Sequence, residues 1–109
     1  MEFDDYQRGA LRTAAPRDTK NELLHLVLGL VGESGEVAEK FKKWVRDLGS
    51  DESRIDRDGI AKELGDVLWY VAVLADYLDL SLDDIASANL AKLADRQGRG
   101  VLGGSGDNR

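Results

Sequence analysis

The stretch Glu33-Ser34-Gly35-Glu36-Val37 returns 30 residues later as Glu63-Leu64-Gly65-Asp66-Val67, and this repeat determines the fold and the site that the sequence predicts. Each copy carries two carboxylates three residues apart, first as ExxE and then as ExxD. On a helix, residues three apart project from one patch of surface. Two such helices packed side by side would bring four carboxylates together, which is a ligand set suited to Mg²⁺.

Composition narrows the classes of function that remain. With 109 residues the chain is one small domain, for which oligomerisation is a fair expectation. It has no cysteine, which excludes a disulfide framework and thiolate chemistry, and its net charge of -6 argues against a surface for duplex nucleic acid. The single histidine, His25, stands among leucines and is read as packing or surface. No membrane span or cleavable signal is visible, so we expect a soluble cytoplasmic protein.

The chain is expected to be all-α, because it has a single proline and no sustained strand-like alternation. We predict helices over residues 3–13, 19–47, 59–78 and 81–96. Thr19 followed by Glu22 predicts a capping box at the second start, and Ser81 is the expected N-cap of the fourth helix, with Asp84 at its third position. We expect a domain over residues 1–97 and a glycine-rich tail over 98–109.

Helical phase places the acids at the margin of the expected core. The apolar faces are those of the third helix (Ile60, Leu64, Val67, Val71, Leu74, Leu78) and of the second (Leu23, Val27, Leu30, Val37, Phe41, Trp44). Carboxylates at a core margin repel one another unless cations neutralise them. A lone ExxE often marks only a solvated face, but two copies in matching phase favour a metal site. Glycines inside both helices indicate a close backbone or room for a ligand, and ligand-free helix packing explains them equally well.

A second set of polar residues lies on one face of the fourth helix: Asn89, Lys92, Arg96 and, if the helix continues, Arg99. Lys and Arg can hold phosphate oxygens, and Asn can orient a hydroxyl or a base. Alternatively, these cations only complement the helix macrodipole. Trp44, Trp69 and Tyr70 could stack on a nucleobase, but both tryptophans are expected in the core. Tyr70 follows Asp66 by four residues and should lie beside the acids.

Three stretches, residues 29–40, 63–70 and 89–96, together with the ending Arg99-Gly100 and Gly106-Asp107-Asn108-Arg109, resemble MazG-like nucleoside triphosphate pyrophosphohydrolases of the all-α NTP pyrophosphatase superfamily. The spacer of 26 residues between the two motifs fits that family. The resemblance implies a four-helix bundle completed by oligomerisation, as a dimer or dimer of dimers. It implies Mg²⁺, with Mn²⁺ as a substitute, at Glu33, Glu36, Glu63 and Asp66, and contacts to a nucleoside triphosphate by Lys40, Tyr70, Asn89, Lys92 and Arg96. Many relatives carry a glutamate where this chain has Gly32.

The function hypothesis is Mg²⁺-dependent hydrolysis of a nucleoside triphosphate between its α and β phosphates, for nucleotide-pool control or house-cleaning. Either Glu33 or Glu36 would accept the proton of the attacking water. Two alternatives stay open, a phosphoribosyl-ATP pyrophosphatase and a non-catalytic, metal-stabilised interaction module. The preferred base and sugar, the number of ions and the oligomer size are not fixed by the sequence.

Overall fold

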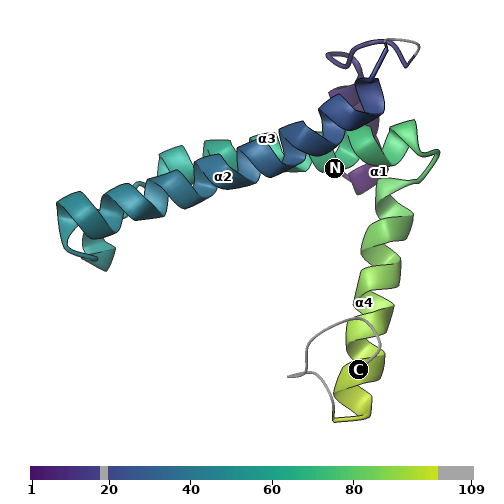
Figure 1. The fold of residues 1–109 in the computed structure, drawn as a ribbon. Coiled ribbons are helices and arrows are strands. Elements are labelled where there is room, and N and C mark those ends of the chain that lie inside the picture. Colours follow the sequence, from purple (N-terminus) through teal and green to yellow (C-terminus); the bar gives the residue numbers. More distant parts are fainter. Residues whose placement is uncertain (18–19, 101–109) are drawn as a thin grey trace.

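The computed structural model describes residues 1–17 and 20–100, and this part of the chain is helical without strands (Figure 1). Helix α1 spans Phe3–Leu11, α2 Glu22–Leu48, α3 Arg57–Tyr77 and α4 Leu82–Gly98, with the short 3-10 helix η1 at Glu52–Arg54. The all-α prediction is confirmed. Among the described residues, no helix is both long and apolar enough to cross a membrane.

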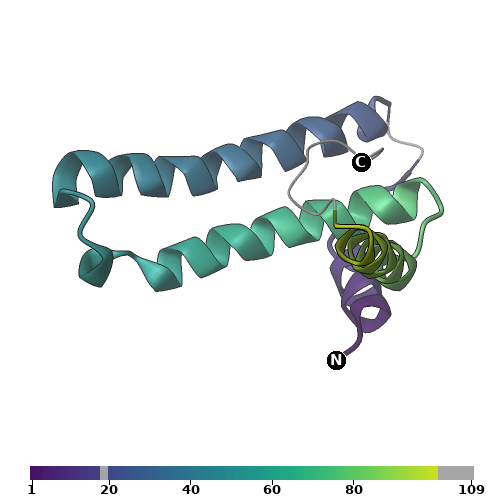
Figure 2. The same ribbon diagram turned by 90° about the horizontal axis from the view of Figure 1, so that it is seen from below.

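Helices α2 and α3 run antiparallel, side by side, as a long hairpin (Figures 1 and 2). Helix α2 ends at Gly49, whose left-handed backbone (φ 62°) suits glycine and lets its N–H bond the Trp44 carbonyl. Asp56 starts α3 by accepting a hydrogen bond from the Gly59 N–H at 3.0 Å. The hairpin therefore has a glycine stop and an aspartate start at its closed end.

The predicted capping box at the start of α2 is wrong. The helix begins at Glu22, and its N-cap is Asn21 with φ 65° and no side-chain cap hydrogen bond. Asparagine tolerates this left-handed conformation better than most residues, so the turn into α2 is set by backbone geometry. Thr19 lies outside the described residues, as does the part of the predicted tail from 101 to 109.

Helix α1 ties α3 to the start of α4. The buried Gln7 side chain donates to the carbonyls of Ala72 (3.0 Å) and Leu80 (3.1 Å), and its oxygen accepts from the Leu82 N–H (3.1 Å). The Ser81 hydroxyl accepts from the Asp84 N–H, which confirms the predicted cap of α4. This anchor leaves the rest of α4 leading away from the hairpin (Figure 1).

The core is small and lies where α1, α2, α3 and α4 meet, around Ala10, Leu26, Ala72, Val73 and Leu82. The predicted apolar phase is partly wrong, since Leu64 and Leu78 are about half exposed and the buried alanines of α3 were missed. The reason is that α3 packs on α2 along its length but also on α1 at its C-terminal half, which changes the buried arc. Four apolar side chains of α2 are more than half exposed: Leu24, Leu28, Val31 and Val45.

Candidate functional site

Three of the four predicted acids meet in the middle of the hairpin. Each of Glu33 on α2 and Glu63 and Asp66 on α3 offers one carboxylate oxygen, and these oxygens all lie within 4.8 Å of one another. Glu33 and Glu63 are half-buried, and Asp66 is exposed. Glu36 is exposed and lies one turn further along α2, outside this acid cluster (Glu33, Glu63 and Asp66). The antiparallel packing thus joins the two motifs, although not all four oxygens to the same degree.

The electrostatics of the acid cluster are those of an uncompensated anionic site. The pKa of Glu33 lies above its ordinary value, first because burial disfavours the carboxylate and then because Asp66, Glu63 and Glu36 repel it. A bound divalent cation would offset both effects, because its positive charge favours the ionised carboxylates that would coordinate it from the two helices. The all-carboxylate donor set fits a hard ion such as Mg²⁺ or Mn²⁺.

Tyr70 closes one side of the acid cluster. Its ring lies directly on the α2 backbone at Gly29, where a Cβ would stand 2.1 Å from Tyr70 Cε1. The ring also packs edge-on against Trp69, with centroids 4.9 Å apart, and the Trp69 indole donates to the Thr13 hydroxyl at 2.9 Å. Gly29 is therefore required by a close approach, whereas a Cβ at Gly32, Gly35 or Gly65 would meet nothing within 4 Å.

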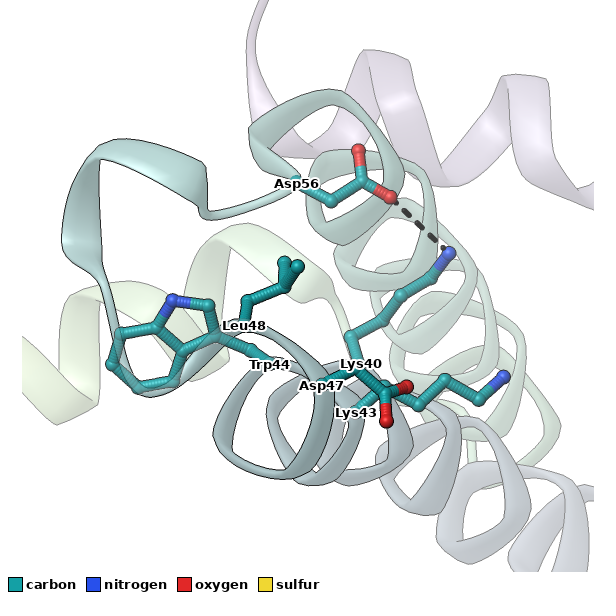
Figure 3. A pocket seen from close by; sticks show the side chains of 6 residues that line it. All are labelled: Lys40, Lys43, Trp44, Asp47, Leu48 and Asp56. Carbon is teal, nitrogen blue, oxygen red and sulfur yellow. Dashed lines mark hydrogen bonds and ion pairs between the residues drawn. The ribbon is translucent and has the colours of Figure 1, made fainter.

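On the other side, toward the closed end of the hairpin, the structure has a cavity of about 220 Å³ (Figure 3). Lys40 Nζ lies 3.5 Å from Asp56 Oδ2 across it, and the Trp44 indole N–H donates to the Asp51 carbonyl at 2.6 Å. Six residues line this end cavity: Lys40, Lys43, Trp44, Asp47, Leu48 and Asp56. Only Lys40 was among the predicted site residues. The spacing 33, 36, 40, 43, 47 on α2 could have predicted Lys43 and Asp47 as well.

The predicted residues of α4 do not join the acid cluster within one chain. Asn89 and Lys92 line a separate hollow of about 330 Å³ with Ile85 and Ala88. Arg96 is buried, and α4 contacts α1 and α3 near its start before leading away from the hairpin (Figure 1). Their part in a substrate site stays a prediction.

Comparisons with known proteins agree with the two motifs. The family model for the MazG nucleotide pyrophosphohydrolase domain matches residues 21–100, which contain every predicted site residue. The chain is also 46% identical to the gene 37 protein of Mycobacterium phage L5 over 114 aligned residues, spanning the whole of both chains. No solved structure matches the chain.

Proposed function

Because this chain belongs to the MazG nucleotide pyrophosphohydrolase family, we propose that it cleaves nucleoside triphosphates between the α and β phosphates, yielding a nucleoside monophosphate and pyrophosphate. The observation that carries this proposal is the meeting of Glu33, Glu63 and Asp66 from two helices with carboxylate oxygens within 4.8 Å. A role in nucleotide-pool control or house-cleaning belongs to the same proposal.

In this proposal the acid cluster holds Mg²⁺, with Glu36 as a fourth acid at its edge. When bound, the ion would neutralise charge on the phosphate oxygens and help to orient water for in-line attack. Glu36 is exposed and stands outside the three-membered cluster, so its carboxylate is the one least committed to an ion. We therefore favour Glu36 over Glu33 as the acceptor of the proton from the attacking water.

The test is pyrophosphate release with Mg²⁺ over a panel of nucleoside triphosphates that includes phosphoribosyl-ATP. Glu63→Gln should lower turnover by about 100-fold or more while circular dichroism stays helical. Glu39→Gln is the matched control, because Glu39 sits on the same hairpin but pairs with Lys42 at 3.5 Å, away from the acid cluster. Wild-type release by Glu63→Gln would contradict the assignment. Silence of the native protein toward the whole panel would contradict the activity and favour a binding module.

We also propose that the protein acts as a homodimer or tetramer. The supporting observation is the row of exposed apolar residues on α2, at Leu24, Leu28, Val31 and Val45, whose spacing of three or four residues, or a multiple of seven, puts them on one helix face. Within one chain α4 leads away from the acid cluster. In the proposed assembly a second copy would supply Asn89 and Lys92, which line a hollow on α4, to that cluster, whereas Arg96 is buried within its own chain.

A further inference from the structure

The acid cluster and the end cavity lie on one continuous face of the hairpin. On α2, Glu33, Glu36, Lys40, Lys43 and Asp47 follow one another at alternating steps of three and four, which keeps them on a single helix face. On the facing side of the hairpin, the N-cap Asp56 is followed at steps of seven, three and four by Glu63, Asp66 and Tyr70 of α3.

Cross-helix contacts have the register that this face requires. Tyr70 lies on Gly29, Glu33 meets Glu63 and Asp66, and Lys40 meets Asp56. From one contact to the next, the position moves one or two turns toward the C-terminus of α2 and toward the N-terminus of α3. A ligand held at the acids can therefore extend along the hairpin without crossing a helix.

The dimensions suit a nucleotide. Lys40 follows Glu33 by seven positions, and Glu63 follows Asp56 by seven, so the near edge of the end cavity, at Lys40 and Asp56, lies about 10 Å from the acid cluster at 1.5 Å per helical residue. The base of a nucleotide lies at a comparable distance from its α phosphate. In the opposite direction the Tyr70 ring on Gly29 fills the space between the helices. The remaining direction along this face leads into the end cavity.

The lining of the end cavity combines an apolar wall with two lysines, Lys40 and Lys43, and two aspartates, Asp47 and Asp56. Trp44 and Leu48 provide the wall, and Lys40 Nζ stands 3.5 Å from Asp56 Oδ2 (Figure 3). The Gly59 N–H, and after it Lys40, lower the pKa of Asp56, so its carboxylate stays an acceptor at neutral pH. Asp47, the other acid of the lining, accepts hydrogen bonds from Arg46 Nε at 2.8 Å and Arg46 Nη2 at 3.0 Å.

We propose, on the basis of the function proposed above, that the end cavity binds the nucleobase of the substrate and that Lys40 and Asp56 select keto bases. Guanine, thymine and uracil carry a carbonyl oxygen next to a ring N–H, so one edge can accept from Lys40 while it donates to Asp56. Adenine and cytosine carry an amino group next to an unprotonated ring nitrogen, which reverses the order of donor and acceptor. A site built for one order leaves its charged groups unpaired against the other.

The selectivity is tested by comparing kcat/KM of pyrophosphate release for dGTP and dTTP with that for dATP and dCTP. We expect the keto bases to be favoured by about tenfold, and Lys40→Met to remove most of that ratio. Lys42→Met is the matched control, because Lys42 is a neighbouring lysine that pairs with Glu39 and does not line the end cavity. A preference for amino bases, or an unchanged ratio in Lys40→Met, would overturn the proposal.

Base binding can be measured without turnover. In a Trp69→Phe protein, Trp44 is the remaining tryptophan, and its fluorescence should be quenched by dGMP more strongly than by dAMP, with Lys40→Met removing the difference. If no triphosphate is cleaved but this quenching is seen, the hydrolase fails and the base site stands. If triphosphates are cleaved without base preference or quenching, the base site alone fails.

Discussion

Gly29→Ala should destabilise the protein, although alanine is the better helix former. The new Cβ would stand 2.1, 2.4 and 2.8 Å from three carbons of the Tyr70 ring, so the ring must shift. Overpacking of this kind destabilises a protein by about 1–3 kcal/mol, whereas replacing glycine by alanine inside a helix stabilises it by about 1 kcal/mol. We expect a net loss of about 1 kcal/mol in the free energy of unfolding, which lowers Tm by about 4–8 °C in a domain of this size.

The assay is chemical denaturation followed by circular dichroism, arranged as a double-mutant cycle with Tyr70→Ala. Once the ring is removed, Gly29→Ala should stabilise by about 1 kcal/mol, which makes the coupling between the two positions about 2 kcal/mol. Gly32→Ala, on the same helix with nothing within 4 Å of its Cβ, should stabilise in both backgrounds. Additive effects of Gly29→Ala and Tyr70→Ala would refute the contact and, with it, the closed side of the acid cluster.

Four further outcomes follow from the structure. Because burial, and after it the neighbouring acids, raise the pKa of Glu33, the folded metal-free chain binds a proton more tightly than the unfolded chain. Its stability should therefore fall as pH rises above about 4.3, the ordinary glutamate value, through the raised pKa. Calorimetry should show Mg²⁺ affinity rising over that same range, with a flatter dependence in Glu33→Gln. Gly59→Ala would place a Cβ 2.2 Å from Asp56 Oδ2, and loss of this helix cap should cost about 1 kcal/mol in a denaturation experiment. Mixing inactive Glu63→Gln and Lys92→Met chains should restore about a quarter of wild-type activity if a second copy supplies Lys92 in random dimers; a mixture that stays inactive would contradict the shared site.

The sequence predicted the elements better than their packing. Helix type follows from local signals such as the Ser81 cap, which was predicted correctly. The buried arc of α3 depends on where α1 crosses it, and that crossing is fixed by Gln7 bonding backbone groups of Ala72, Leu80 and Leu82. No periodicity in α3 carries this information, which is why Ala72 and Val73 were missed as core residues.

The acid cluster was predictable for a similar reason, since both halves carry the same local pattern and only one pairing of two helices satisfies it. Glu36 shows the limit of the argument. Helix phase puts it on the same face as Glu33, but the acid cluster forms where α2 comes opposite Glu63 and Asp66, one turn away. Spacing fixes a face, whereas the register of the partner helix fixes which residues on that face meet.

The same register reaches further than the two motifs. Once Glu33 lies opposite Glu63 and Asp66, antiparallel packing requires that residues one or two turns away on α2 lie opposite residues an equal distance the other way on α3. Lys40 opposite Asp56 is one result, and Gly29 under Tyr70 is the other. The hairpin is thus closed by an aromatic ring on one side of its acids and opens into a charged cavity on the other. An extended substrate anchored at the acids would for this reason lie in one direction along the hairpin, and Lys40 beside Asp56 would then decide which bases it accepts.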